Sequence, residues 1–103
     1  MVKSDCILER MTEYFNNKGF PVLVRRLSKG YSIVNEYGEP LARFRPAPGN
    51  TNRVEVLWWK YSGKWGHIGD FGGLFMDLEK ALDYVVSDPM GIFWKGKIDF
   101  FPR

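Results

Sequence analysis

The spacing of apolar residues predicts two amphipathic helices, one near each end of the chain. In the first, apolar side chains recur at helical spacing over about residues 5–18, and Gly19 ends the pattern. Those side chains are Ile7, Leu8, Met11, Tyr14 and Phe15. The second runs from an N-cap at Asp77 to about Ser87, because Pro89 disfavours helical geometry in the residue before it. Its apolar positions are Leu78, Ala81, Leu82, Val85 and Val86.

Between the two helices, the pattern changes to short runs rich in β-branched and aromatic residues, separated by turn residues. The predicted strands are Val22 to Leu27, Tyr31 to Glu36, Leu41 to Arg45, Val54 to Lys60 and Lys64 to Ile68. The turns are too short for the crossovers that parallel pairs need, and the fourth strand is apolar on both faces, as central strands are. We therefore expect an α+β fold, in which an antiparallel meander sheet of about five strands has the N-terminal and C-terminal helices packed on one face.

Length and composition are typical of one folded domain spanning residues 1–103. The chain is 45% hydrophobic and 17% aromatic, which excludes a disordered protein. Its longest apolar run, from Val56 to Trp59, is far shorter than the roughly 20 residues needed to cross a bilayer. Charged residues such as Asp5 and Glu9 interrupt the N-terminal stretch, so no signal peptide is indicated. We expect a cytoplasmic protein with no membrane partner.

Positive charge is concentrated in the middle of the chain. From Lys18 to Lys64 there are nine basic residues against three acidic ones, a net charge of +6, whereas the whole chain carries +3. The segments before and after are slightly acidic. An acidic partner should therefore bind the middle of the sequence.

The inventory of reactive side chains argues against catalysis. His67 is the only histidine, so any nucleophile and base pair would have to use it, together with Asp70 and Cys6. Cys6 lies on or beside the apolar stripe of the first helix, where we expect a buried and inert thiol. An enzyme centred on His67 is kept as an alternative to a non-catalytic protein.

Metal and cofactor sites are not predicted either. His67 and Asp70 offer two ligands, whereas a stable transition-metal site needs three or four. The glycine-rich stretch 66–73 lacks both the lysine-serine pair of a phosphate loop and the glycine order of a dinucleotide fold. One cysteine cannot form an internal disulfide.

A basic and aromatic stretch is the feature that favours a binding function. Arg43 and Arg45, two residues apart, share one face of a predicted strand, and further basic and aromatic residues follow on the next one. The candidate face for nucleic acid or another acidic partner consists of Arg43, Arg45, Arg53, Lys60 and Trp59, with Trp58 or Trp65 as the other candidates for an exposed aromatic side chain. Such a face suits single-stranded nucleic acid, whose bases stack on aromatic rings while arginines contact phosphates. The alternative is that these tryptophans fill the core.

The C-terminal third holds more bulky apolar side chains than one helix and one short strand readily cover. Trp94, Phe100 and Phe101 form a candidate interaction tail for a protein partner, of which a homodimer is the simplest version. The alternative is that this tail folds back over the sheet edge and completes the core of the monomer.

Several segments together resemble a family of small bacterial proteins that is classed as a domain of unknown function. They are Pro40 to Arg45, Val56 to Trp59, Gly63 to His67, Leu78, and Asp88 to Trp94, and the resemblance covers about residues 38–94. This sequence departs from the family by inserting Gly66 between Trp65 and His67 and by continuing for nine residues past Trp94. The resemblance implies a shared fold and a bacterial origin, and it implies no activity.

From the sequence we therefore expect a small, non-catalytic binding or interaction module. The alternatives are a nucleic-acid-binding domain that uses its basic, aromatic sheet face, and an enzyme centred on His67.

Overall fold

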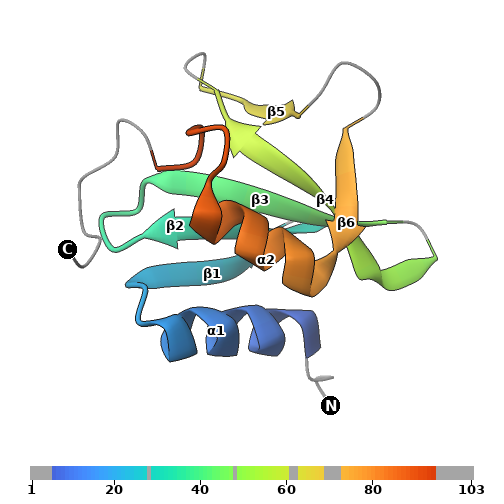
Figure 1. Cartoon of the computed structure of the whole chain (residues 1–103), viewed down its shortest axis with the longest axis horizontal. Coiled ribbons are helices and arrows are strands. Elements are labelled where there is room, and N and C mark those ends of the chain that lie inside the picture. Colours follow the sequence, from blue (N-terminus) through green and yellow to red (C-terminus); the bar gives the residue numbers. More distant parts are fainter. Residues whose placement is uncertain (1–5, 28, 48, 61–62, 69–72, 95–103) are drawn as a thin grey trace.

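A computed structural model of the chain describes residues 6–27, 29–47, 49–60, 63–68 and 73–94. The elements in chain order are α1 (Cys6–Lys18), β1 (Val22–Leu27), β2 (Gly30–Asn35), β3 (Pro40–Ala47), β4 (Asn50–Trp59), β5 (Trp65–His67), β6 (Leu74–Asp77) and α2 (Leu78–Ser87). Within these ranges, six strands form one antiparallel sheet that is preceded by α1 and followed by α2 (Figure 1). This arrangement confirms the predicted α+β fold.

The sheet follows the chain order from β1 to β5, and β6 then returns to pair with β4. One edge of β4 pairs with β3, while its other edge is shared between β5, opposite residues 57–59, and β6, opposite residues 53–56. The prediction that this strand is central is thereby confirmed. β6 was not predicted, and it closes the part of the β4 edge that β5 leaves open.

The two faces of the sheet differ sharply in composition. Successive residues of a strand point to opposite faces, and the face toward the helices, called the inner face below, is apolar. Its buried side chains are Val24, Tyr31, Ile33, Ala42, Phe44, Val54 and Val56. Met11 and Phe15 of α1 join the same core as Leu82 and Val85 of α2. Both helices therefore pack on one face and leave the opposite, outer face free of helices.

The two helices also contact each other. Arg10 of α1 forms an ion pair with Glu79 of α2 at 3.4 Å, and one turn further along both helices the Tyr14 hydroxyl donates a hydrogen bond to the Asp83 carboxylate. In both contacts the partner on α2 lies 69 residues after the residue on α1, so the two helices run side by side in the same direction. Neither of the two described helices is long and apolar enough to span a membrane.

The segment after α2 is fastened by Asp88. This residue ends the helix in the left-handed conformation, with φ of 46°, and confirms the predicted end at Ser87. Its carboxylate accepts hydrogen bonds from the backbone amides of Ile92, Phe93 and Trp94 at 2.8 to 3.3 Å. The chain is thereby turned back over the core, where Phe93 is fully buried.

Two local expectations about the helix starts are corrected by the structure. Cys6 is exposed rather than buried, because it is the first residue of α1 and precedes the apolar stripe. Asp77 occupies the predicted N-cap position of α2, but its side chain forms no capping hydrogen bond.

Candidate functional site

The outer face brings together side chains from β3, β4 and β5. In the antiparallel register, Arg43 of β3 lies opposite Leu57 of β4, which in turn lies opposite His67 of β5. Arg45 lies two residues further along β3, and Trp65 two residues before His67 on β5, so all of these side chains point away from the helices. The predicted pairing of Arg43 and Arg45 on one face, with Phe44 buried on the other, is confirmed.

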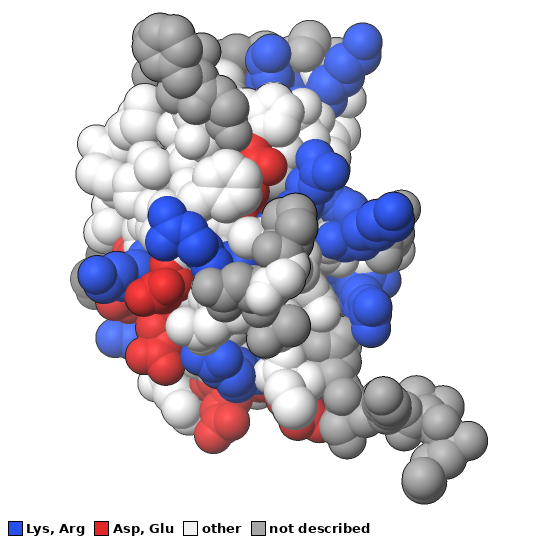
Figure 2. Space-filling view, turned by 90° about the vertical axis from the view of Figure 1, so that its right-hand side faces the viewer, with Lys and Arg blue, Asp and Glu red and all other residues white. Residues whose placement is uncertain are grey.

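A shallow concavity of about 420 Å³ opens among these side chains. It is lined by Lys29, Arg43, Arg45, Leu57, Trp65 and His67. Three of these residues carry a full positive charge at neutral pH. Figure 2 shows Lys and Arg side chains gathered on its right-hand side, the side of the outer face, whereas the acidic side chains lie mostly to the left and below. The concavity thus combines positive charge with an aromatic and an apolar wall.

Arg43 is held in place at the edge of this concavity. Its Nη1 donates to the Ser32 hydroxyl at 2.8 Å, and its Nη2 donates to the backbone carbonyl of Leu27 at 2.7 Å. The guanidinium lies against the backbone of Gly30, where a Cβ would approach Nη2 to 2.9 Å. A glycine at the start of β2 therefore makes room for the arginine, and the β1–β2 hairpin fixes its orientation.

The two arginines of the concavity form no ion pair with a described carboxylate. The pKa of Arg43 is lowered, mainly because burial desolvates its charge and secondly because Arg45 repels it. An anionic ligand would relieve this repulsion.

The acidic side chain of β4 on this face, Glu55, lies beneath the surface. It is only 6% exposed, and the Nδ1–H of His67 donates a hydrogen bond to its carboxylate. The backbone of Gly73 lies close to the oxygen that His67 contacts, since a Cβ there would lie 2.2 Å from Glu55 Oε2. The ring of His67 remains 58% exposed at the concavity. The buried carboxylate therefore orients the histidine and leaves a basic surface above it.

The other predicted members of the basic face are distributed differently. Trp59 lies on the outer face and packs edge-on against Trp65, with the ring centroids 4.9 Å apart and the ring planes at 74° to each other. Arg53 lies on the same face near the opposite end of β4, outside the concavity, and donates to the carbonyl of Phe75 at 3.5 Å.

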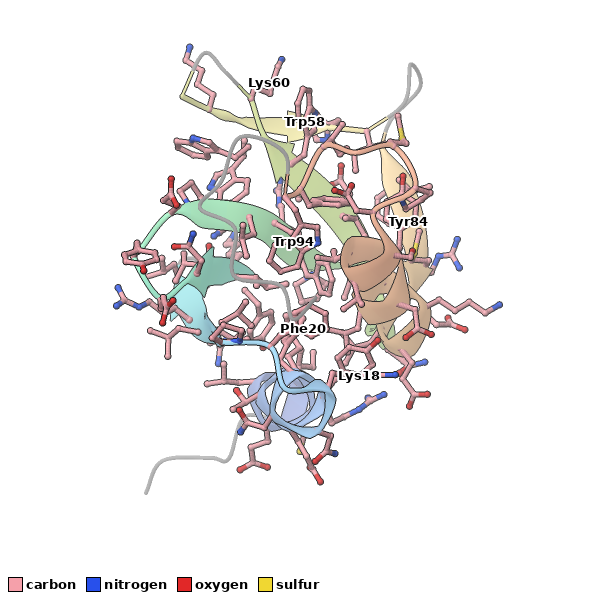
Figure 3. The ribbon with its side chains drawn as sticks, turned by 60° about the vertical axis from the view of Figure 1, so that its left-hand side comes forward. Lys18, Phe20, Trp58, Lys60, Tyr84 and Trp94 are labelled. Atoms are coloured by element: carbon pink, nitrogen blue, oxygen red, sulfur yellow. The ribbon has the colours of Figure 1, made fainter. Side chains whose placement is uncertain are left out.

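Lys60 does not join Arg43 and Arg45. Lys60 follows the last residue of β4. Its aliphatic chain packs against Gly66, where a Cβ would lie 2.3 Å from Lys60 Cδ, and the indole nitrogen of Trp58 lies beside the same position (Figure 3). Trp58 is paired with Gly66 and packs partly on the inner-face core. Lys60 and Trp58 therefore lie on the inner side of the β4–β5 hairpin, because even-numbered positions of β4 point inward.

Sequence reasoning missed three features of the concavity. Lys29 lies in the β1–β2 turn, and the sequence gives no sign that this turn reaches Arg43. The sequence marks His67 as a candidate for catalysis or metal binding and does not indicate that it lies near the arginines, and Glu55 contributes there only a negative charge. Only the register between β4 and β5 brings His67 close to Glu55.

The predicted interaction tail is partly placed. The indole of Trp94 stacks on the ring of Phe20, with the ring centroids 5.7 Å apart (Figure 3). Its Nε1–H donates a hydrogen bond to the backbone carbonyl of Val85 at 2.8 Å. Trp94 therefore completes the core. This favours the alternative in which the segment folds back on its own monomer. Phe100 and Phe101 lie outside the described residues.

Of the predicted reactive side chains, the structure describes Cys6 and His67, and these two lie apart. Cys6 belongs to α1 on the inner side of the sheet, whereas His67 lies on the outer face, and Asp70 lies outside the described residues. Within the described part of the chain, no group of three or more His, Cys, Asp or Glu side chains could hold a metal ion.

Comparison with protein-family models, with curated proteins and with solved structures found no match. The geometry of the outer face is therefore the basis for a functional proposal.

Proposed function

We propose that this protein is a small, non-catalytic binding module that holds single-stranded nucleic acid on the outer face of its sheet. The observation that carries this proposal is the concavity in which Lys29, Arg43 and Arg45 lie together with Trp65. We place this function in the cytoplasm of a bacterial cell, as the sequence leads us to expect.

Each component of the concavity matches one part of a nucleotide. The two arginines present planar groups of N–H donors that suit phosphate oxygens, and Lys29 adds a mobile positive charge. Trp65 supplies an aromatic surface for a base, and base stacking on aromatic rings contributes about 1–3 kcal/mol per base. Trp59 packs against Trp65 and so restrains it.

A single strand suits this surface better than a duplex. The concavity is shallow and lies on a sheet, and in a duplex the faces of the bases are stacked on one another and inaccessible to tryptophan. A strand with unstacked bases can place a base on Trp65 and a phosphate on the arginines at the same time.

The separation of Cys6 from His67 supports a non-catalytic role. Nucleophilic catalysis by a thiol requires a base within hydrogen-bond reach, and these two residues lie on opposite sides of the sheet. His67 is instead tied to Glu55.

Binding can be tested by fluorescence anisotropy with an internally labelled oligothymidylate. We expect saturable binding at low salt, with log Kd rising by about 0.7 per phosphate contact for each tenfold increase in salt. Arg45→Gln should weaken binding about tenfold, because it removes charge-assisted hydrogen bonds.

Lys80→Gln is the matched control for that variant. It removes one positive charge from the exposed surface of α2, on the helical side of the molecule, and should leave Kd almost unchanged. The absence of binding at low salt, or equal effects of the two substitutions, would contradict the proposal.

A further inference from the structure

We infer, on the basis of the proposed nucleic-acid binding, that the concavity receives the terminal phosphate monoester of a strand rather than an internal phosphodiester. The convergence of Lys29, Arg43 and Arg45 on one small concavity leads to this inference.

The number of charges exceeds what one phosphodiester needs. A phosphodiester carries a single negative charge, whereas a phosphate monoester carries about −1.5 to −2 at neutral pH and exposes three strong acceptor oxygens. A surface that follows an internal backbone spreads its basic residues along a groove. Here three cationic side chains from the β1–β2 turn and β3 line the same concavity, so they can contact one phosphate group together.

The size of the concavity also favours the end of a strand. Its volume of about 420 Å³ lies near the lower limit for pockets that hold one small ligand, roughly 300–1,000 Å³. That space accommodates a single nucleotide. Trp65 belongs to the same lining, so the base of that nucleotide can stack while its phosphate meets the arginines.

Both arginines keep N–H donors for such a phosphate, and hydrogen bonds fix the position of Arg43. Arg43 uses one N–H on each terminal nitrogen for Ser32 and Leu27, and three of its five N–H groups remain. Arg45 is exposed and opposite Glu55 in the register, yet it forms no ion pair with any described carboxylate. The Glu55 carboxylate is already bound by His67. Repulsion between the two arginines, which contributes to the lowered pKa of Arg43, would be relieved by a dianion.

The inference is tested with three hexathymidylates that carry the same internal fluorophore. One has a 5′-phosphate, one a 3′-phosphate, and one hydroxyl groups at both ends. We expect one of the phosphorylated strands to bind about tenfold more tightly than the hydroxyl strand, because a charge-assisted phosphate contact has that magnitude. The preferred end would define the direction in which the strand lies.

Two variants and one control link this preference to the concavity. Arg45→Gln should abolish the preference for a phosphorylated end. Gly30→Ala retains every charge but pushes the Arg43 guanidinium aside, and it should abolish the preference too. Lys80→Gln should keep it.

The outcomes separate this inference from the proposed function. Equal affinity for all three strands would overturn the terminal-phosphate site while leaving strand binding intact. A preference that persists in both Arg45→Gln and Gly30→Ala would also overturn it, and thermal unfolding of each variant verifies that it is folded. If no strand binds, both the site and the proposed function are wrong.

Discussion

At the scale of single residues, several side chains act by fixing the backbone around them. Asp88 is the clearest case, because its left-handed backbone ends α2 while its carboxylate accepts hydrogen bonds from three consecutive amides. Arg43 plays a comparable role on the outer face, where it joins Leu27 to Ser32 across the β1–β2 hairpin.

Asp88→Ala should destabilise the protein by about 2 kcal/mol. The substitution leaves three amides without their acceptor and places a Cβ-bearing residue in the left-handed conformation without a polar side chain. Urea denaturation followed by tryptophan fluorescence measures the change. Asp88→Asn tolerates the same backbone conformation and keeps one acceptor oxygen, so it should recover part of the loss; if both variants match the parent protein, the carboxylate does not hold this segment.

Tyr14 should make stability depend on pH in the alkaline range. Burial raises the pKa of its phenol, and so do the hydrogen bond to Asp83 and the negative charge of Asp83. The folded protein therefore holds this proton more tightly than the unfolded chain. The stabilisation that the Tyr14 phenol adds to the free energy of unfolding is complete below the ordinary tyrosine pKa of about 10, and it is lost as the pH rises above that value.

Tyr14→Phe should consequently cost about 1 kcal/mol at pH 7, the usual net value of a hydrogen bond, and less above about pH 10. Chemical denaturation of both proteins at pH 7 and pH 11 measures the two differences. A difference that stays constant or grows with pH would show that the Tyr14 hydroxyl is not bound to Asp83 in solution.

At the scale of helices and strands, β4 organises the molecule. It pairs with three other strands, its inner side chains form part of the core, and Leu57 on its outer side lines the concavity. We therefore expect Val56→Ala, which creates a cavity at a fully buried position, to destabilise the fold by about 2 kcal/mol.

Val34→Ala provides the comparison for that variant. Val34 lies in β2, on the outer face, and is half-buried, so the same truncation there should cost less than half as much. Thermal or urea denaturation of the two variants measures the difference. Equal losses would contradict the assignment of the inner and outer faces.

Local patterns predicted most of these elements, because apolar periodicity and turn residues are properties of neighbouring positions. The 3.6-residue spacing indicated α1 and α2, and short runs of β-branched and aromatic residues between turn residues indicated the first five strands. β6 was missed because Leu74–Asp77 is only four residues long and continues directly into α2. Its pairing with residues 53–56 depends on a distant part of the chain.

The candidate site was predictable only where its residues are neighbours in sequence. The spacing of Arg43 and Arg45 defined a shared face, and the structure confirms it. Lys60 lies just one position past β4, where the alternation places it on the opposite side from Trp59. The contributions of Lys29 and His67 follow from the β1–β2 turn and from the β4–β5 register, which no local pattern determines.

At the scale of the whole molecule, the two sides of the sheet have separate roles. The helices and the inner face form the core, and the segment around Trp94 closes it. The outer face contributes little to that core and collects positive charge from the middle of the chain (Figure 2). Charge at this face can therefore change without loss of the fold, and we expect binding variants such as Arg45→Gln to unfold at nearly the same temperature as the parent protein.

The most direct measurement is a two-dimensional ¹⁵N NMR titration with an oligothymidylate. The account predicts that the indole N–H signal of Trp65 and the amides of Lys29, Arg43 and Arg45 shift on binding, while the indole signal of Trp94, which is bonded to Val85 inside the core, stays in place. Shifts confined to α1 and α2, or an unmoved Trp65 signal at saturation, would contradict the claim that the outer face of the sheet is the binding surface.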